Sequence, residues 1–497
     1  MVKNSRGPFI KRFQTARGYY IYDINTNRIL RVEPEVYAVC ADFHRLPENE
    51  IVEKHASRLG RQNVVAAIKK IDAACKQENL LLPDRPEGLS NGGLTPEEYR
   101  SRYMNQLAHA ALDITQNCNL NCSYCGREWN SVAWKGKRRG MSEKTAFAAI
   151  DFLFAHSRDK KRRTLSFYGG EPLLKFGLIQ KCVDYAYALF GKEGIRFNIT
   201  SNGLLIDRKT AQYLKQHRFL TMISIDGPAQ LHDRHRKDWQ GRGSYNRAVR
   251  GFKRLLDAYG DELKHHLSLN MVVTPPYDLT ALEGLWDENT WLPKDMHKID
   301  FVNWENTAFL EKHDCDFSRS IHRRTRKKAM ADFKKGCIAG HPDASPVAYS
   351  IFEPALIRIN KRPVYKEPTK SYQMNGCCVP GTRKVFVTSE GQLRICERCY
   401  GSPILGTVFK GYDHEMMQGL VATYIKESID DCKKCWAIGM CTVCFANVYT
   451  NGRFDIARKR RFCKSKKAQL MGALKLYCTI LEENPCAFDF MKKIQLK

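Results

Sequence analysis

Long hydrophobic runs are absent from this sequence. Of its 497 residues, 43% are hydrophobic, yet no apolar stretch reaches the roughly 18 residues that a membrane-spanning helix requires. The basic N-terminus, residues 1–14, also lacks the apolar segment that would follow in a secretory signal. We therefore expect a globular, cytoplasmic protein that does not insert into a membrane.

Acidic residues are scarce relative to basic ones. The chain has 81 Lys and Arg against 53 Asp and Glu, which gives a formal net charge of +28. Such a surface attracts polyanions, either nucleic acid or an acidic peptide, although ordinary solvated faces explain part of the excess. No zinc-finger or RRM-like motif supports nucleic acid, so we expect no such partner. Basic runs lie at 135–139, 158–163 and 323–328.

Cysteine, in contrast, is abundant, with 19 residues. Ten of them fall between residues 377 and 478, and three more crowd into NCNLNCSYCG, residues 117–126. Disulfides do not persist in a reducing compartment. Clustering of this kind in a chain without a secretory signal therefore indicates metal ligands.

The N-terminal region has the pattern of an independent α+β module. Residues 18–24 and 28–32 are aromatic and β-branched runs joined by a short polar turn, which predicts a β-hairpin. Pro34 is expected to open a helix. A later helix is predicted from an apolar stripe at helical spacing, formed by Val64, Ile68, Ile71 and Cys75. We expect a winged-helix-like arrangement, followed by a linker with the Pro, Gly, Ser and Asn content of residues 84–93.

The central region alternates short apolar runs with segments of helical period. Ser142 is a suitable N-cap for a helix over 141–156. Successive β-α units predict an α/β fold with a parallel sheet, and ligands gather at the carboxyl ends of such strands. The three crowded cysteines come directly after the first run and so belong to this edge. The expected strands are 110–115, 164–168, 195–200, 220–225, 267–274 and 300–304.

The remaining sequence completes the expected division of the chain. Residues 306–376 carry no clear motif, and helical period returns over 468–481. We expect an N-terminal module (1–83), a linker (84–107), a barrel region (108–305), a bridging region (306–376), a cysteine-rich region (377–465) and a C-terminal helix and tail (466–497).

Three interpretations compete for the Cx3Cx2C spacing of Cys118, Cys122 and Cys125. A structural zinc site needs a fourth ligand, and the nearest downstream candidates, His156 and Cys182, lie far along the chain. Cysteines that serve only as small hydrophobes would not need this spacing in a polar loop. A 4Fe-4S cluster takes four thiolates when fully ligated, so three would leave one iron open to a second molecule.

The sequence resembles the radical S-adenosylmethionine (SAM) superfamily at several places. CNLNCSYC is similar to the family motif CxxxCxxC with an aromatic residue before the last cysteine, and FYGGEPLL (167–174) is similar to the GGEP element. ITSNG (199–203), SIDG (224–227) and HDRHR (232–236) resemble later elements that follow successive strands. The resemblance implies a partial (β/α)6 barrel, and a 4Fe-4S cluster whose open iron binds SAM. Electron transfer to SAM would then yield a 5′-deoxyadenosyl radical.

The same resemblance assigns cofactor contacts. Gly170 and Glu171 would hold the methionyl amino group of SAM, and Arg236 would pair with its carboxylate. Taken singly, each of these polar residues is more often a cap or a turn residue than a ligand. The other implied contacts are Tyr124, Ser201, Asn202 and Ser224.

The cysteine-rich region resembles the SPASM domain, in which cysteines hold auxiliary iron–sulfur clusters. Cys441 and Cys444 are separated by two residues where the family usually has three. Two zinc sites of ribbon type are the structural alternative, because paired Cx2C motifs serve zinc equally well. The resemblance implies two auxiliary 4Fe-4S clusters, one held by Cys432, Cys435, Cys441 and Cys463, the other by Cys378, Cys396 and Cys444 with Cys377, Cys399 or an open iron in the fourth position.

Glu397, directly after Cys396, is the candidate catalytic base. The resemblance to sulfatase-maturating relatives, in which an acid follows the corresponding cysteine, implies that it takes a substrate proton. The alternative is an exposed acid paired with Arg394 or Arg398.

The N-terminal module narrows the expected function. YYIYDINTNRILRVEPEVYAVC, residues 19–40, resembles PqqD-like domains that recognise leader peptides, and an extended leader would add a strand at residues 28–32. A cap that merely packs on the barrel is the alternative. Together the resemblances imply a radical SAM peptide maturase that forms an intramolecular thioether or carbon–carbon cross-link in a precursor peptide with a leader. Its electrons would come from an external donor of flavodoxin or ferredoxin type.

Two other functions share part of these features. A sulfatase-maturating, formylglycine-forming radical SAM enzyme would have both cysteine regions without needing a leader-binding module. A nucleic-acid-modifying or nucleic-acid-binding iron–sulfur protein would explain the net charge of +28 more directly.

Overall fold

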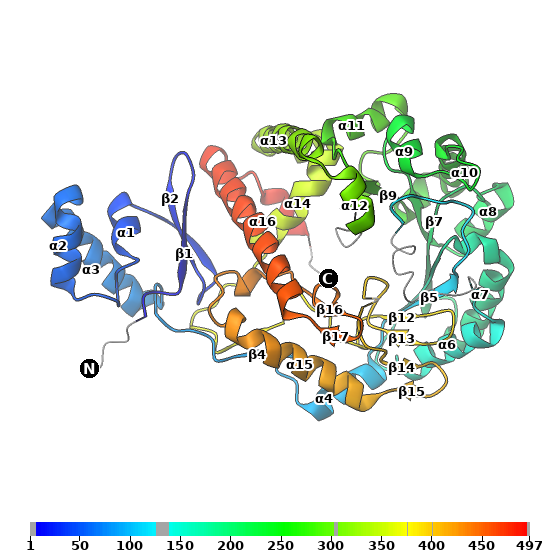
Figure 1. The fold of residues 1–497 in the computed structure, drawn as a ribbon, viewed down its shortest axis with the longest axis horizontal. Coiled ribbons are helices and arrows are strands. Elements are labelled where there is room, and N and C mark those ends of the chain that lie inside the picture. The colour runs from blue at the N-terminus through cyan, green and yellow to red at the C-terminus, as the bar shows by residue number, and fades with distance from the viewer. Residues whose placement is uncertain (1–5, 126–138, 303–306, 375, 400, 495–497) are drawn as a thin grey trace.

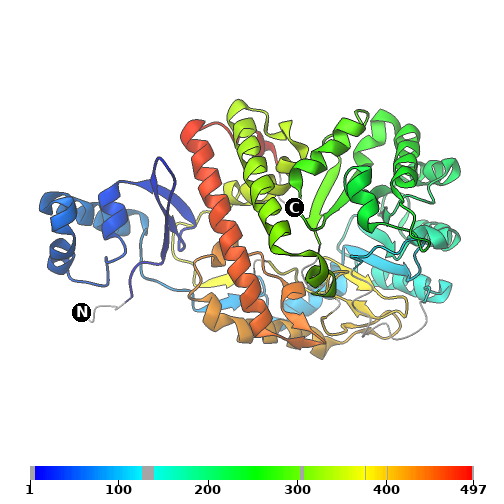
Figure 2. The same ribbon diagram turned by 45° about the horizontal axis from the view of Figure 1, so that its top comes forward.

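The computed structural model describes residues 6–125, 139–302, 307–374, 376–399 and 401–494. Most of the basic run expected at 135–139 lies outside these ranges. Figures 1 and 2 both place the N-terminal module at one end of the molecule and the barrel at the other, with the long helix α16 (Ile456–Glu483) between them. Within the described ranges, no helix combines the length and apolarity that crossing a bilayer would require.

The N-terminal module contains an antiparallel sheet with the strand order β1-β2-β3. Its strands are β1 (Ile10–Gln14), β2 (Tyr19–Asp23) and β3 (Arg28–Val32), and its helices are α1 (Pro34–Val39), α2 (Glu48–Leu59) and α3 (Arg61–Glu78). The predicted hairpin is confirmed, because β2 pairs with β3 from Tyr19↔Val32 to Asp23↔Arg28. The helix expected at Pro34 is also present, with proline in its first turn.

The two faces of this sheet are buried against different partners. Ile21 belongs to a core that includes the predicted stripe of α3, Val64, Ile68, Ile71 and Cys75. Tyr20 and Tyr22, on the opposite face, belong to the main core of the molecule. Side chains alternate between the faces of a strand, so this one strand serves both cores.

The segment expected to be a linker contains regular structure. Strand β4 (Gly88–Ser90) pairs in parallel with β11 (Ser371–Gln373). Helix α4 (Pro96–Asn105) follows, and Thr95 and Glu98 form a capping box at its start. Hydrogen bonds from distant parts of the chain therefore hold this connection.

The central region forms the expected α/β unit of parallel strands, which run in the order β10-β9-β8-β7-β6-β5. The helix predicted over 141–156 is confirmed as α6 (Glu143–Ala155), and the Ser142 side chain accepts a hydrogen bond from the Thr145 backbone N–H. The strands are β5 (His109–Thr115), β6 (Arg163–Gly169), β7 (Ile195–Ser201), β8 (Leu220–Ser224), β9 (Leu267–Val273) and β10 (His297–Phe301). The other helices around them are α7 (Phe176–Phe190), α8 (Arg208–Gln216), α9 (Ala229–His235), α10 (Tyr245–Leu263) and α11 (Leu279–Glu288).

The sixth strand lies earlier in the sequence than predicted. It was expected at 300–304, but β10 spans His297–Phe301 and pairs with β9 from His297↔Leu269 onward. Lys298 and Asp300 are polar and line a cavity, so this strand has no apolar run to mark where it begins. Residues 303 and 304 lie outside the described ranges.

The cysteine-rich region extends the barrel sheet, which the sequence pattern did not predict. Strand β12 (Val385–Val387) pairs in parallel with β5, and β13 (Leu393–Arg394) pairs antiparallel with β12. Arg398, just after β13, forms a salt bridge of 3.0 Å with Asp300 of β10 at the other end of the sheet. The two ends of the eight-stranded sheet therefore meet across the barrel.

The remaining helices cover the open side of the barrel. In the bridging region these are α12 (Thr307–His313), α13 (Asp316–Ala339) and α14 (Pro346–Asn360), and α15 (His414–Cys432) precedes the Cx2C pairs. Helix α16 contains the predicted helical stretch 468–481 and packs on both α13 and α14. Short pairs of strands, β14 (Gly406–Thr407) with β15 (Gly411–Tyr412) and β16 (Tyr449–Thr450) with β17 (Arg453–Phe454), connect these elements.

Candidate active site

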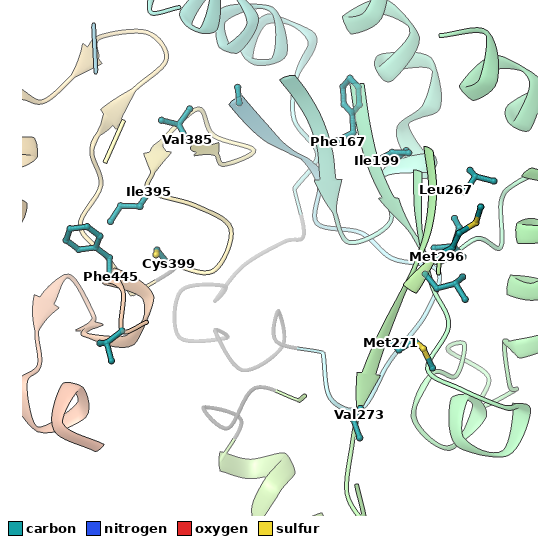
Figure 3. Close-up of a cluster of buried hydrophobic side chains, with 14 of the residues drawn as sticks. Phe167, Ile199, Leu267, Met271, Val273, Met296, Val385, Ile395, Cys399 and Phe445 are labelled. Atoms are coloured by element: carbon teal, nitrogen blue, oxygen red, sulfur yellow. The ribbon is translucent and has the colours of Figure 1, made fainter. Parts of the chain in front are cut away.

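A continuous cavity of about 2270 Å³ occupies the interior of the barrel. Its lining comes from the barrel strands, the three-cysteine loop, helices α13 and α14, and the cysteine-rich region with α16. Figure 3 shows Phe167 and Ile199 on the barrel strands and Cys399 and Phe445 on the opposite side. All four residues line the cavity.

The three-cysteine loop contributes Cys118, Cys122 and Cys125 to this lining. The three thiols lie close enough together for their charges to interact. Among the residues that the structure describes, no three His, Cys, Asp or Glu side chains approach closely enough to share a single metal ion. A four-iron cluster binds each thiolate on a separate iron and so holds its ligands further apart.

The segment after α9 clamps this loop. The Asn121 N–H donates to the Lys237 carbonyl at 2.7 Å, and the Ser123 N–H donates to the His235 carbonyl at 3.1 Å. The Trp239 indole N–H donates to the Cys118 carbonyl at 2.9 Å. These three hydrogen bonds hold the loop in position.

The GGEP element lies directly against the same loop. The Gly170 N–H donates to the Thr115 carbonyl at 2.6 Å, and the Glu171 N–H donates to the Asn117 carbonyl at 2.8 Å. A Cβ at Gly170 would lie 2.1 Å from the Asn117 carbonyl oxygen. This position therefore needs glycine because two backbone segments touch there.

Glu171 is fully buried and joins the ends of two strands. Its carboxylate accepts hydrogen bonds from the Ser201 hydroxyl at 2.9 Å and from the Asn202 N–H at 2.8 Å. Burial raises the pKa of this carboxyl, and the hydrogen bonds from Asn202, Leu173 and Ser201 oppose the rise. Gly170, Ser201 and Asn202 line the cavity at this edge, whereas Glu171 itself is not among the lining residues.

Asn202 also reaches the cysteine loop. Its amide nitrogen donates to the Asn119 side-chain oxygen at 2.7 Å and lies 3.8 Å from the Cys118 sulfur. A polar group beside a cluster sulfur tunes the reduction potential of the cluster. Asn202 thus connects the end of β7 to the three-cysteine loop.

Tyr124, Asp226 and Arg236 form a buried polar group beside the loop. The Tyr124 hydroxyl donates to Asp226, and the Arg236 guanidinium donates to the Tyr124 hydroxyl at 2.7 Å. A guanidinium nitrogen of Arg236 lies 3.8 Å from a carboxylate oxygen of Asp226. Tyr124, Ser224 and Arg236 line the cavity.

Asp226 was not singled out from the sequence. Besides Tyr124, it accepts a hydrogen bond from the Val272 N–H at 2.9 Å, and so connects β8 to β9. The available signal was its place inside SIDG, two residues after Ser224. His232 and Asp233 of HDRHR hold the start of α10 through Ser244, which positions Arg236.

Glu397 lines the cavity just after β13, near His109 at the start of β5, and is paired with a lysine. Its carboxylate is 2.5 Å from the Lys384 ammonium, and both side chains are mostly buried. Burial alone would raise the pKa of Glu397, but the charge of Lys384 and its hydrogen bond outweigh this and lower the pKa. Arg398, one of the two arginines considered as alternative partners of Glu397, forms its salt bridge with Asp300.

A lysine is buried among the auxiliary cysteines. Lys459 of α16 is 1% exposed, and its ammonium lies 3.4 Å from the Cys432 sulfur. It also lies within Coulombic range of Cys463 and Cys441. No salt bridge to a carboxylate is found for it in the part of the chain that the structure covers. A buried ammonium needs an anionic partner, and four thiolates around a metal centre would supply one.

The bridging region contributes lining residues for which the sequence offered no motif. His322, Arg326 and Met330 of α13 and Phe352 of α14 face the cavity. The Arg326 guanidinium lies over the Phe352 ring at 4.9 Å. The sequence of this region has helical character, but it does not show that these helices line the cavity.

Comparison with known proteins identifies the central region. The radical SAM superfamily model matches residues 112–285. The chain is 27% identical over 340 residues to a cysteine-type anaerobic sulfatase-maturating enzyme of Clostridium perfringens, which covers 66% of this chain and 85% of that protein. It is 24% identical over 222 residues to the radical SAM cyclopropyl synthase TigE of Paramaledivibacter caminithermalis, with 40% of this chain and 45% of TigE covered.

A solved structure has the same fold. Native anSMEcpe with bound AdoMet and Cp18Cys peptide superposes with a TM-score of 0.55 at 18% identity, over 78% of this chain and 100% of that one. For five curated relatives, the matched region spans only between 39% and 48% of their length. Radical SAM domains use SAM and a 4Fe-4S cluster, which fits the three cysteines and the polar strand ends around them. Residues 112–285 of this chain therefore form a radical SAM domain.

Proposed function

We propose that this chain is a radical SAM enzyme that modifies a ribosomally made precursor peptide by forming an intramolecular thioether or carbon–carbon cross-link. The observation that carries the proposal is the cavity of about 2270 Å³, which joins the three-cysteine loop to Glu397 and the cysteine-rich region. Ligand sites for small molecules measure about 300–1,000 Å³. A space of this size supports a peptide segment as substrate, in addition to SAM.

The residues of the radical SAM domain would hold the cofactors. Cys118, Cys122 and Cys125 would ligate the 4Fe-4S cluster, and Gly170, Glu171, Ser201, Asn202, Ser224, Arg236 and Tyr124 would surround SAM. When bound, these two groups supply a 5′-deoxyadenosyl radical that abstracts a hydrogen atom from the substrate. The buried Tyr124 and Asp226 would keep Arg236 oriented toward the cavity.

Glu397 would take the proton that the substrate releases. Its lowered pKa keeps it ionised at neutral pH, which a base requires. Lys384 would hold the carboxylate in place. We expect Glu397→Gln to stop peptide modification while 5′-deoxyadenosine is still released, because Glu397 is not among the residues that would hold the cluster or SAM. Equal loss of both products would contradict this role.

The cysteine-rich region would hold two auxiliary 4Fe-4S clusters. The buried Lys459 supports a dianionic centre at Cys432, Cys435, Cys441 and Cys463, since it lacks a salt bridge to any described carboxylate. A zinc centre with four thiolates would carry the same charge. Iron and sulfide analysis after anaerobic reconstitution separates the two, because about two zinc ions without extra iron would exclude auxiliary iron–sulfur clusters.

The N-terminal module would bind the leader of the precursor. Strand β3 is an edge of the sheet, and a leader could pair with it as a further strand. The module also has a hollow of about 580 Å³ beside β1, lined by the cations Arg6, Lys11, Arg12, Arg45 and Arg85 without an acidic side chain. This charge supports an acidic leader.

The deciding experiment uses the full chain with SAM, dithionite in place of the natural electron donor, and candidate precursor peptides encoded beside the gene. We expect one peptide to lose two hydrogen atoms by mass spectrometry, only when its leader is attached. Failure to cleave SAM under these conditions would exclude every radical SAM activity. Cleavage without modification of any leader-bearing peptide would exclude the maturase.

Sulfatase maturation is the second candidate. It is favoured by the similarity to the sulfatase-maturating enzyme of Clostridium perfringens, which covers 85% of that protein. A short sulfatase peptide that contains cysteine or serine, without any leader, is the matched substrate. Its conversion to formylglycine would replace the first proposal.

A further inference from the structure

We infer that Cys399 is the fourth ligand of the first auxiliary cluster, so that Cys378, Cys396, Cys399 and Cys444 close its coordination. The inference rests on the auxiliary clusters of the proposed function. It excludes both of the other possibilities for the fourth position, Cys377 and an open iron.

Cys396 and Cys399 form a CxxC turn immediately after β13. The Cys399 N–H donates to the Cys396 carbonyl at 3.0 Å, and the two sulfurs lie 3.4 Å apart. The hairpin that leads to this turn is fixed by pairing of β12 with both β5 and β13. The barrel sheet thus presents two thiols together, in the spacing by which many iron–sulfur sites bind their metal.

The other ligands of this cluster lie around the same turn. Cys444 lies close enough to Cys396, Cys399 and Cys378 for its charge to interact with theirs. Cys444 begins the short 3-10 helix Phe445–Asn447, and its N–H donates to the Asn447 side chain at 3.1 Å. Four cysteines from three separate segments therefore converge on one region.

Cys377 lies beside the segment that carries Cys444 and outside the CxxC turn. Its thiol donates to the Val443 carbonyl at 3.8 Å, and its N–H donates to the Met374 carbonyl at 2.8 Å. A Cβ at the preceding Gly376 would lie 2.1 Å from the Val443 carbonyl oxygen, so these two segments are pressed together. Cys377 is thus held against a backbone segment and, unlike Cys399, does not line the cavity.

The position of Cys399 determines what a substrate in the cavity would contact. Of the cysteines in the auxiliary set, all of which the structure describes, Cys399 is the one that lines the cavity. Figure 3 shows it on the loop after β13, on the same side of the cavity as Phe445. The substrate would therefore meet a ligand thiolate of the cluster and would find no free iron to bind.

The test isolates the auxiliary clusters by replacing Cys118, Cys122 and Cys125 with alanine in the full chain. After anaerobic reconstitution this protein should hold about eight irons, four for each cluster. Cys399→Ala is added to it, with Cys377→Ala as the matched control. Iron, sulfide and the EPR spectrum of the reduced clusters are measured with and without 2-mercaptoethanol, a thiol that binds an open iron.

We expect 2-mercaptoethanol to leave the spectrum of the parent and of Cys377→Ala unchanged. Cys399→Ala should either lose about four irons or show a signal that 2-mercaptoethanol shifts. Cys399→Ser covers the case of a variant that fails to fold, because an oxygen ligand should keep the cluster with an altered signal.

Three outcomes would overturn the inference: an unchanged signal and iron content in both Cys399 variants, loss of the cluster in Cys377→Ala alone, or a parent spectrum that already responds to 2-mercaptoethanol. A parent without iron refutes the auxiliary clusters themselves. That result is distinct from a failure at Cys399.

Discussion

Gly170 controls how closely the second barrel strand can approach the cysteine loop. Its alanine variant would bring a Cβ to 2.1 Å from the Asn117 carbonyl oxygen, one residue before Cys118. Overpacking of this kind costs about 1–3 kcal/mol. We expect Gly170→Ala to lower the rate of 5′-deoxyadenosine formation by about tenfold or more, because the loop that holds the cluster must move. Chromatography of the reaction and the iron content measure this.

Gly177, close in sequence, is the matched control. It lies in the first turn of α7, and a Cβ there would meet nothing within 4 Å. Alanine in a helix is favoured over glycine by roughly 0.5–1 kcal/mol, so Gly177→Ala should be as stable or more stable and fully active. Equal rates for Gly170→Ala and the wild type would mean that the loop tolerates the displacement.

The effect of replacing Lys459 on protein stability should depend on whether the metal centre is bound. Without a cluster its buried ammonium is uncompensated, so Lys459→Met should leave the metal-free protein as stable or raise its thermal unfolding temperature. With the cluster bound, the same change removes the attraction to the thiolates and should lower stability. The reduction potential of that cluster should fall by roughly 60 mV, because a positive charge favours the reduced state.

Two measurements check this prediction, thermal unfolding of metal-free and reconstituted protein and EPR-monitored redox titration. Lys475→Met, an exposed position on the same helix, is the control for loss of charge alone. A change of the same sign in both metal states would argue against a bound anion near Lys459.

At the level of single residues, sequence motifs pointed to candidate ligands but gave no sign of the residues that support them. Cys118, Cys122, Cys125 and the GGEP glycines were readable because chemistry demands those residues at that spacing. Asp226 and Lys459 act through contacts with elements that are distant in the sequence, Val272 of β9 and Cys432 of α15. No local pattern encodes such contacts.

At the level of elements, five of the six barrel strands were found within one or two residues, because their apolar runs are clear. β10 was misplaced because Lys298 and Asp300 alternate into a polar cavity. The pairing of β12 with β5 was missed entirely, since these strands are only three residues long where they pair and lie far apart in sequence. Long-range pairing of short strands leaves no periodic signal.

The edge strand β3 provides a prediction about leader binding. Adjacent residues in a strand present their N–H groups to opposite sides, so proline at Arg28 and at Arg31 affects different sides of β3. One of Arg28→Pro and Arg31→Pro should keep the fold and weaken precursor binding by about tenfold, through loss of an edge hydrogen bond and steric exclusion. The other should disturb the pairing with β2.

Fluorescence anisotropy of a labelled precursor peptide measures the affinity, and circular dichroism measures the fold. SAM cleavage without peptide should stay at the wild-type rate in the folded variant, because β3 lies outside the barrel. If every folded variant binds the precursor as the wild type does, the leader does not pair with this edge.

At the scale of the whole molecule, the N-terminal module is docked on the rest of the chain by specific contacts. The Tyr372 hydroxyl donates to the Ile24 carbonyl at 2.7 Å, and the Arg362 guanidinium donates to the Asn27 carbonyl at 2.7 Å. Phe13, Tyr20 and Tyr22 are buried in the main core. Deleting the module would therefore expose aromatic surface, and a deletion variant would not separate peptide binding from stability.

A single contact at the far end of α16 offers a cleaner test of this docking. The Glu482 carboxylate accepts hydrogen bonds from the Thr15 hydroxyl at 2.6 Å and from the Tyr20 hydroxyl at 2.8 Å. In Glu482→Ala both hydroxyls lose their partner, which costs about 1–3 kcal/mol. The module should then detach more often, with faster proteolysis in the segment 84–95 and release of an N-terminal fragment.

Docking of the N-terminal module should also affect how efficiently the peptide is modified. If the leader positions the substrate through a docked module, Glu482→Ala should lower the fraction of SAM cleavage that ends in modified peptide, while the affinity for the isolated leader stays the same. Glu483→Ala, which removes an exposed salt bridge with Lys334 on the neighbouring position, is the control and should change neither. Unchanged coupling in a variant whose module is demonstrably looser would mean that the leader only tethers the substrate, and that the cavity alone aligns it.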